Sequence, residues 1–351
     1  MNTSRELHHV FSVGHGHRFF GVFILATNRD HGIVVLCSFT FGHQLDVGAL
    51  AMASRSASGN GMRASDTRAL LRRRGFVAKK SMGQNFVVDD ALLRRVVHEM
   101  RVVGDASVLE IGPGTGNLTR HLLEAGARVL AVEKDDRLVA SLAEDFASDV
   151  SEGRLELVHA DVLRWLADGD VQVSSHARGR CRVVANLPYN VTSDVLKRIL
   201  PRGDVFEDLH LMLQDEAGRR LVQARPGDKD YRAMSVRVDY YCSRADYLFR
   251  VGREKYFPQP HVDSCVVAMA LRTPEERLPL CDGNVHAYFS MVQRAFLARR
   301  KALRNALAPT YASTDVAAAV AELAWPADVR PQSLSSADYV HLYNRLGGAR
   351  R

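Results

Sequence analysis

Glu110-Ile111-Gly112-Pro113-Gly114-Thr115-Gly116-Asn117 follows an apolar run and precedes a helical pattern. Glycines in such a stretch let the backbone turn tightly and let a ligand approach it closely. The glycines occupy alternate positions, Gly112, Gly114 and Gly116, whereas the dinucleotide-binding fingerprint has the spacing G-x-G-x-x-G. The stretch therefore predicts a strand, a ligand-binding turn and a helix, and the alternative is a plain tight turn.

Apolar runs of strand length recur along the chain and alternate with helical patterns. They are SVLEI at 107–111, RVLAVE at 128–133, LELVHAD at 155–161, RVVANLPY at 182–189 and LHLMLQ at 209–214. This alternation is typical of a doubly wound parallel sheet, whose strands are buried on both faces and therefore apolar throughout. The predicted fold class is α/β, a Rossmann-like sheet with a small C-terminal helical domain.

The pattern becomes helical in the last part of the chain. Helices are predicted at 286–307 and 315–323, and Ser335 and Asp338 have the spacing of a capping box that opens a last helix. The predicted organisation is an N-terminal extension at 1–75, an α/β domain at 76–272 and a helical domain at 273–351.

Charge and cysteine content limit the function classes. The chain has 47 basic and 40 acidic side chains, but residues 1–80 hold eleven of the bases and four of the acids, so the rest is balanced. An RNA partner must therefore be argued from local patches. The five cysteines form no C-x-x-C pair and no Cys/His cluster, so we expect no metal site, no disulfide framework and a reducing compartment.

The N-terminal extension has two compositional parts. Its apolar stretches at 19–26 and from Ile33 are separated by polar residues and are too short to cross a bilayer, so we expect no membrane segment. From Met52 the chain is rich in Ser, Ala and Arg, which is typical of an organelle transit peptide. The alternative is an untranslated upstream stretch followed by a basic arm, with Met52 or Met62 as the true start.

Acidic side chains end the two predicted strands after the glycine motif. Glu133 lies 21 residues after Gly112, where its carboxylate can accept hydrogen bonds from both ribose hydroxyls of a nucleoside cofactor. Asp161 closes the next strand and can accept from an adenine amino group. Each acid alone is equally well a solvated strand-end residue. Together with the alternate glycines, they predict S-adenosylmethionine, which has no pyrophosphate to place at the helix N-terminus.

The fourth predicted strand ends in Asn186-Leu187-Pro188-Tyr189. The lone pair of an exocyclic adenine nitrogen is delocalised into the ring, so its N–H bonds must be drawn into acceptors. The Asn186 side-chain carbonyl and the Leu187 backbone carbonyl can accept them, and Pro188 restricts Leu187 to the extended conformation. Tyr189 would stack on a base taken out of its helix or loop. The alternative is a strand that runs into a proline turn with a packed tyrosine.

These motifs resemble the KsgA-type ribosomal RNA adenine dimethyltransferases, from about Lys79 to Arg304. Further blocks resemble the family in order: KSMGQNFV at 80–87, LQDE at 213–216 and FPQPHVDS at 257–264. The resemblance implies that S-adenosylmethionine is bound by Asn85, Val87, Gly112, Gly114, Gly116, Glu133, Asp161 and Asn186. It also implies catalytic roles for Asn186, Leu187, Pro188 and Tyr189, with Phe257 as the second wall of the base pocket.

The resemblance implies N6,N6-dimethylation of adjacent adenines in the 3′-terminal hairpin of small-subunit rRNA and a role in ribosome maturation. The expected partner is small-subunit rRNA within the immature subunit, and we expect a monomer. Two residues depart from the family pattern: Val87 replaces the usual Leu, and His261 replaces a common Lys, which puts one RNA contact in doubt. The stretches 200–206 and 253–258 look most like plastid members, so we expect a chloroplast protein. Mitochondrion, or cytoplasm without a transit peptide, are the alternatives.

Two other function classes remain open. The same fold serves as a non-catalytic transcription factor or ribosome-assembly factor, and loss of S-adenosylmethionine binding would favour that class. A DNA adenine methyltransferase would usually carry D/N-P-P-Y/F, and Leu187 in place of the first proline argues against it.

The segment 293–304 is basic and contains no acid. As one continuous helix it would pack Phe296, Leu297 and Leu303 on the body and turn its cations outward. A solvated basic face is the alternative, and the resemblance favours an rRNA-binding surface. The predicted RNA-binding residues are Arg294, Arg299, Arg300, Lys301 and Arg304.

Overall fold

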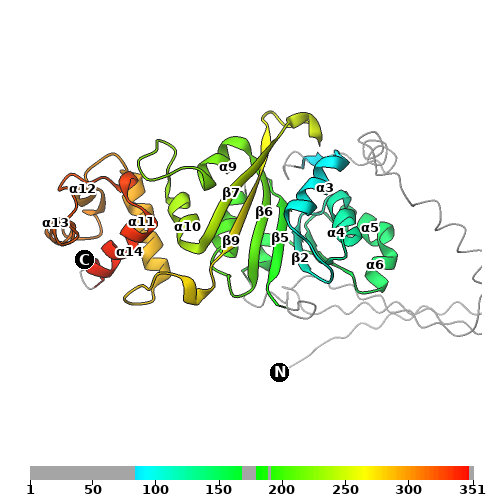
Figure 1. The fold of residues 1–351 in the computed structure, drawn as a ribbon, viewed down its shortest axis with the longest axis horizontal. Coiled ribbons are helices and arrows are strands. Elements are labelled where there is room, and N and C mark those ends of the chain that lie inside the picture. Colours follow the sequence, from blue (N-terminus) through cyan, green and yellow to red (C-terminus); the bar gives the residue numbers. More distant parts are fainter. Residues whose placement is uncertain (1–83, 168–178, 189–190, 348–351) are drawn as a thin grey trace, which may run out of the picture. The chain divides into compact units, whose positions relative to one another are not determined.

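The computed structural model describes residues 84–167, 179–188 and 191–347, which Figure 1 draws as coloured ribbons. Tyr189 and the predicted extension at 1–75 lie outside these residues. Within the described ranges, no helix is long and apolar enough to cross a membrane.

The chain divides into two compact units. The first unit ends at Pro188 and also contains Arg253–His261, and the second unit contains Tyr189–Gly252 and Val262–Arg351. All described residues predicted to bind the cofactor or to act in catalysis belong to the first unit. The predicted RNA-binding residues belong to the second.

Four parallel strands form the centre of the first unit, in the order β4, β3, β2, β5. They are β2 (Ser107–Ile111), β3 (Arg128–Glu133), β4 (Leu155–His159) and β5 (Cys181–Asn186). The register pairs Ile111 of β2 with Val132 and with Ala185, so the carboxyl ends of these strands lie at one edge. Each strand begins within one residue of the run that predicted it and ends within three residues of that run's end, because continuous apolar runs suit strands buried on both faces.

One helix precedes the four parallel strands and further helices lie between them, as expected for parallel neighbours. They are α3 (Asp90–Glu99), α4 (Asn117–Glu124), α5 (Asp136–Asp145), α6 (Ala147–Ser151) and α7 (Val162–Trp165). The carboxylates of Asp89, Asp135 and Asp161 cap α3, α5 and α7 by accepting a backbone N–H of the first turn. Helices α4 and α5 contact β3, and α5 also contacts β4 (Figure 1). These contacts fix the strand-to-helix turns in which the predicted site lies.

A two-stranded ribbon joins two distant segments of the first unit. Strand β1 (Phe86–Val87) pairs antiparallel with β8 (Tyr256–Phe257), which follows the 3-10 helix η2 (Arg253–Lys255). Phe86 is opposite Phe257 in the register. The predicted cofactor-binding segment around Val87 therefore lies beside the predicted base-pocket residue Phe257.

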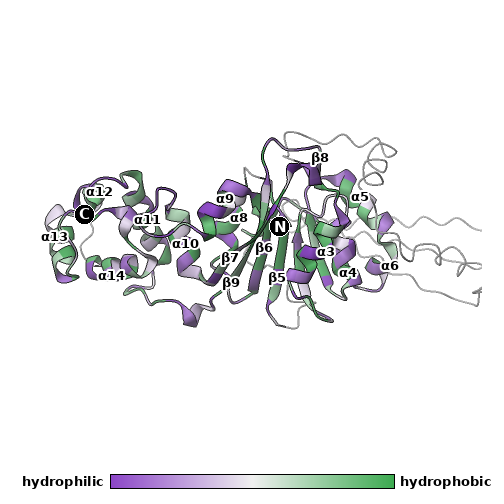
Figure 2. Ribbon diagram, turned by 45° about the horizontal axis from the view of Figure 1, so that its top comes forward, coloured by the Kyte–Doolittle hydropathy of each residue, from purple (hydrophilic) through white to green (hydrophobic). Residues whose placement is uncertain are grey.

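The second unit contains three antiparallel strands in the order β6, β9, β7. They are β6 (Phe206–Gln214), β7 (Cys242–Val251) and β9 (Ser264–Leu271). The prediction of parallel strands throughout is therefore wrong for this part of the chain. The connection from β7 to β9 is short and holds no helix longer than η2, so it cannot make the crossover that parallel neighbours need. Strands β5 and β6 consist mainly of hydrophobic residues in Figure 2, whereas α3 and α9 contain both hydrophobic and hydrophilic residues.

Helices make up the rest of the second unit, and after β9 the described chain contains no further strand of regular length. The earlier helices are α8 (Thr192–Ile199), α9 (Asp215–Val222) and α10 (Ala233–Tyr241). The later ones are η3 (Pro274–Glu276), α11 (Val285–Leu297), α12 (Leu303–Leu307), α13 (Ser313–Glu322), η4 (Pro331–Ser333) and α14 (Ser336–Leu346). These helices share one compact unit with β6, β7 and β9, so the domain boundary at 273 stays a prediction.

Aromatic side chains hold α10 against α11. Tyr240 and Tyr288 have ring centroids 5.2 Å apart, and Tyr241 and Phe289 have centroids 5.4 Å apart. All four side chains are buried. Large aromatic rings bury much apolar surface each, so this cluster stabilises the packing of α11 on α10.

The structure contains the predicted last helix, but it has two helices where one continuous helix was predicted at 286–307. The Ser335 hydroxyl accepts from the Asp338 N–H and the Asp338 carboxylate accepts from the Ser335 N–H, which is the predicted capping box. Helix α11, by contrast, ends at Leu297, and α12 begins at Leu303. The five intervening residues form a turn.

Candidate active site

The glycine motif forms a turn between β2 and α4 in which all three glycines have positive φ. The φ values are +70° for Gly112, +60° for Gly114 and +77° for Gly116. A Cβ at Gly116 would lie 2.6 Å from Phe146 Cε2, and one at Gly114 would lie 2.9 Å from Phe86 Cδ1. A Cβ at Gly112 would meet nothing within 4 Å. Gly114 and Gly116 are thus required by the packing of the protein, whereas Gly112 leaves open space at the end of β2.

The carboxylate of Glu133 ties the end of β3 to this turn. Its Oε2 accepts a hydrogen bond from the Gly114 N–H at 3.1 Å, and its Oε1 accepts from Lys134 and Asp135 at 2.8 and 2.9 Å. The residue is 8% exposed. Burial raises the pKa of Glu133, and the three backbone donors oppose this shift. A carboxylate oxygen accepts more than one hydrogen bond, so the Glu133 carboxylate can also accept hydrogen bonds from ribose hydroxyls.

A second acid lies below the same turn and was not among the predicted site residues. Glu110 in β2 is 2% exposed, and its Oε2 accepts a hydrogen bond from the Thr119 hydroxyl at 2.7 Å. Burial raises the pKa of Glu110 to about 8. Thr119 is fully buried in α4, so this contact joins the strand before the glycine turn to the helix after it. The sequence signal is an acidic residue inside an apolar strand run.

Asp161 lies two residues after β4 and caps α7 rather than ending the strand. Its carboxylate accepts the Leu163 N–H at 2.9 Å and forms an ion pair with Lys134 Nζ at 2.7 Å. Burial would raise the pKa of Asp161, but the Lys134 ammonium and the Leu163 N–H outweigh burial and lower it. Lys134, which the sequence did not single out, therefore links the end of β3 to the N-cap residue of α7.

The Asn186 side chain at the end of β5 is held by a backbone contact to the segment before β1. Its Nδ2 donates to the Asn85 carbonyl at 2.8 Å. Because the amide is planar, this contact directs the Asn186 carbonyl Oδ1 away from Asn85. Leu187, which follows, has a buried side chain, and Pro188 is partly exposed. The structure thus brings together two of the predicted cofactor-binding residues, Asn85 and Asn186.

Val87 and Phe257 lie in the ribbon formed by β1 and β8. The Val87 carbonyl accepts from Asn117 Nδ2 at 2.9 Å, which connects this ribbon to the first turn of α4. Phe257 is half-buried and packs against the buried pair Phe86 and Leu138. Phe86 is also the residue that limits space at Gly114, so the ribbon contacts the glycine turn.

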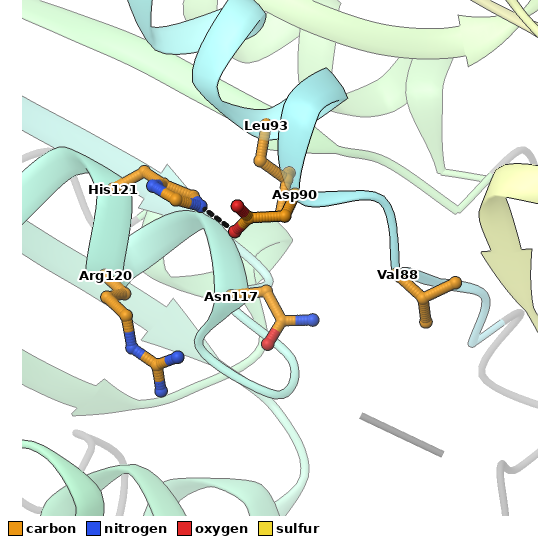
Figure 3. A pocket seen from close by; sticks show the side chains of 6 residues that line it. All are labelled: Val88, Asp90, Leu93, Asn117, Arg120 and His121. Carbon is orange, nitrogen blue, oxygen red and sulfur yellow. Dashed lines mark hydrogen bonds and ion pairs between the residues drawn. The ribbon is translucent and has the colours of Figure 1, made fainter. Parts of the chain in front are cut away.

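A pocket lies between α3 and α4 (Figure 3). Its lining residues are Val88, Asp90, Leu93, Asn117, Arg120 and His121. The His121 ring points to the Asp90 carboxylate, with Nε2 2.6 Å from Oδ1, whereas Arg120 points away from both (Figure 3). Nδ1 of His121 lies 3.2 Å from the Glu124 carboxylate. This pocket differs from the predicted cofactor site and shares only Asn117 with the glycine motif.

The predicted RNA-binding residues lie on three structural elements. Arg294 is in α11, and Arg304 is in α12. Arg299, Arg300 and Lys301 lie in the turn between them, so the prediction of one continuous helix that turns its cations outward is wrong. Leu297 is 73% exposed rather than packed on the body, and Leu303 is buried as predicted.

The described residues contain no cluster of His, Cys, Asp and Glu that could hold a metal ion. Cys181, Cys242 and Cys265 are buried free thiols, Cys281 is an exposed one, and Cys37 lies outside the described residues.

The parallel strands, the alternate-glycine turn after β2 and the buried carboxylate at the end of β3 define a class I methyltransferase domain. Residues 75–346 match the sequence model described as "Ribosomal RNA adenine dimethylase". The chain belongs to this family of methyltransferases.

Curated relatives agree with this assignment. The chain is 36% identical over 281 residues to "Ribosomal RNA small subunit methyltransferase, chloroplastic" of Arabidopsis thaliana. The aligned region covers 78% of this chain and 80% of that protein. It is 33% identical over 287 residues to "Ribosomal RNA small subunit methyltransferase A" of Protochlamydia amoebophila, covering 82% and 98%.

Solved structures show the same fold. A dimethyladenosine transferase from Plasmodium falciparum superposes with a TM-score of 0.62 at 21% identity, covering 75% of this chain and 98% of that one. The 23S rRNA methyltransferase ErmE superposes with a TM-score of 0.54 at 25% identity, covering 75% and 99%. The predicted α/β methyltransferase fold is therefore confirmed.

Proposed function

We propose that this protein transfers methyl groups from S-adenosylmethionine to the N6 atoms of adjacent adenines in the 3′-terminal hairpin of small-subunit rRNA. The observation that carries the proposal is the contact between Asn186 Nδ2 and the Asn85 carbonyl. This contact directs the Asn186 carbonyl Oδ1 away from Asn85, so that Oδ1 can accept a hydrogen bond from a substrate amino group. A matching family and an intact Asn186-Leu187-Pro188 sequence support catalysis over a purely structural role.

The first unit fits S-adenosylmethionine at the carboxyl ends of its strands. Gly112 leaves room for a ligand against the backbone, because a Cβ there would meet nothing within 4 Å. Glu133 offers a buried carboxylate for the ribose hydroxyls, and Asp161 offers one for the adenine amino group. When bound, S-adenosylmethionine supplies an electrophilic methyl group on a sulfonium.

The residues of the chain would activate the substrate nitrogen without a charged base. Asn186 Oδ1 and the Leu187 carbonyl would accept hydrogen bonds from the two N6–H groups of adenine. These hydrogen bonds would localise the lone pair on N6. Pro188 keeps Leu187 extended, which aims its carbonyl. Tyr189 and Phe257 hold the extruded base between two rings. Methyl transfer would break the bond from sulfur to the methyl group, release the thioether S-adenosylhomocysteine and leave N6 cationic, and N6 would then lose one proton to water.

The partner we propose is the rRNA of the immature small subunit, bound by the monomer through the cations of the second unit. A chloroplast location is proposed because a chloroplastic protein is among the relatives and the segment from Met52 has a transit-like composition.

The test is to incubate the protein with S-adenosylmethionine and immature small subunits from a strain that lacks the modification. Mass spectrometry should then detect dimethyladenosine at two adjacent positions of the 3′-terminal hairpin. The Asn186→Ala variant should give none while it still folds. Cofactor binding without any methylation of rRNA would favour a non-catalytic assembly factor and contradict the proposal.

A further inference from the structure

Two arginines of the second unit converge on one backbone carbonyl. Arg299 Nη1 donates to the Lys229 carbonyl at 2.7 Å, and Arg232 Nη1 donates to the same oxygen and to the Tyr231 carbonyl. Lys229 lies in the loop between α9 and α10, Arg232 is the N-cap residue of α10, and Arg299 follows α11. Two segments that are distant in the sequence, 229–232 and the turn after α11, therefore place two guanidinium groups side by side.

The like charges of the two guanidinium groups repel each other. A carbonyl oxygen carries only a partial negative charge and cannot neutralise two guanidinium groups. Neither Arg232 nor Arg299 forms an ion pair with a carboxylate in the described part of the chain. Desolvation and the neighbouring cations Arg299 and Arg220 lower the pKa of Arg232, and Asp230 opposes this shift.

A third arginine lies near the pair. Arg220 of α9 forms an ion pair with Glu216, but its Nε is buried and makes no hydrogen bond within the described ranges. On the other side, Arg300 and Lys301 continue the turn from Arg299 and are exposed. The cations therefore extend in space from the turn after α11 to α9.

We propose that Arg232 and Arg299 form a phosphodiester-binding clamp for rRNA, with the Lys229 carbonyl holding both guanidinium groups in position. Each guanidinium has five N–H donors in a fixed plane, so one hydrogen bond to Lys229 leaves donors for phosphate oxygens. The clamp extends the rRNA surface beyond the basic segment 293–304 to the loop before α10. This inference rests on the proposed function, because that function supplies the RNA.

The first test measures binding of the full chain to immature small subunits over a range of salt concentrations. Arg232→Ala and Arg299→Ala should each weaken binding about tenfold and reduce the salt slope by about 0.7–0.9, as expected for one lost phosphate contact. Arg232→Lys should keep most of the slope, because it keeps the charge. Arg244→Ala is the matched control, since Arg244 is 71% exposed in the same unit and pairs with Asp246. All variants should bind S-adenosylmethionine as the wild type does.

The second test needs no variant. Phenylglyoxal modifies accessible guanidinium groups of the wild-type protein, and bound subunits should protect Arg232 and Arg299 but leave Arg244 reactive. Binding of Arg232→Ala equal to that of Arg244→Ala, or Arg232 left unprotected, would overturn the clamp while wild-type methylation keeps the proposed function intact. A wild type that binds the cofactor but no rRNA would overturn both.

Discussion

Glu133 and Gly114 are joined by a hydrogen bond of 3.1 Å from the Gly114 N–H to the Glu133 carboxylate. The same carboxylate also accepts the N–H groups of Lys134 and Asp135. Glu133 thus orders the glycine turn before any ligand arrives, and a ribose bound there would meet a carboxylate already fixed in place. Fixed acceptors of this kind reduce the ordering cost of binding.

Glu133→Ala should therefore weaken binding of S-adenosylmethionine by roughly tenfold to a hundredfold. Hydrogen bonds to a charged group contribute about 1.5–3 kcal/mol, which corresponds to that range. Isothermal titration calorimetry measures the effect, and Glu144→Ala in the exposed part of α5 is the control. Unchanged affinity in Glu133→Ala would remove Glu133 from the cofactor site.

Gly112→Ala should mainly lower the affinity for the cofactor, whereas Gly116→Ala should mainly lower the thermal stability of the protein. Both glycines have positive φ, so each alanine is strained by about 1–2 kcal/mol. At Gly116 the added Cβ also lies 2.6 Å from Phe146 and 2.7 Å from Leu142, and we expect a clear loss of thermal stability. At Gly112 the Cβ meets no protein atom within 4 Å, so cofactor affinity should fall more than stability does. Equal melting temperatures of the two variants would contradict this contrast.

The parallel half of the sheet was predictable, and the antiparallel half was not. Apolar runs mark strands but carry no direction, and β7 is largely half-exposed along its length. The end of α11 at Leu297 could not be predicted either, because residues 298–302 are all good helix formers. Tertiary contacts override this propensity: the Leu303 N–H donates to the Val329 carbonyl at 2.8 Å, and Arg299 donates to Lys229.

Tyr189→Ala should leave the affinity for S-adenosylmethionine nearly unchanged and sharply lower turnover on rRNA. The proposed partner of Tyr189 is the extruded base, and stacking of a base on an aromatic ring contributes roughly 1–3 kcal/mol. Tyr189→Phe keeps the ring and should retain most activity. If single-turnover methylation fell as far in Tyr189→Phe as in Tyr189→Ala, the hydroxyl rather than the ring would be required.

His121→Ala should destabilise the first unit by about 1–3 kcal/mol without changing the methylated position. The His121 ring is 6% exposed and its Nε2 lies 2.6 Å from the Asp90 carboxylate, so its removal leaves space in the buried contact between α3 and α4 and takes away this hydrogen bond. Urea unfolding measures the effect. His98→Ala, at an exposed position of α3, is the control and should unfold like the wild type.

The places of Glu133, Asp161 and the glycine turn could be predicted because they lie at or just after the carboxyl ends of neighbouring parallel strands, which meet at one edge of the sheet. The contacts that hold them could not, since they join residues far apart in the sequence. Asn186 meets Asn85, Lys134 meets Asp161, and the β1–β8 ribbon brings Phe257 beside Phe86. Such pairings depend on the completed fold rather than on any local pattern.

Glu110→Gln should flatten the pH dependence of stability between about pH 4.5 and pH 8. Burial raises the pKa of Glu110 from 4.5 to about 8, so in this window the folded state holds a proton that the unfolded state has lost. Stability from this group is therefore complete below pH 4.5 and is lost as the pH rises, by at most about 1.4 kcal/mol per pH unit. The Gln carbonyl keeps the acceptor for the Thr119 hydroxyl. Urea unfolding at pH 5, 6, 7 and 8 should show the variant gaining stability relative to the wild type at each step. Since Glu133 is present in both proteins, parallel pH profiles would mean that Glu110 is ionised in the folded state.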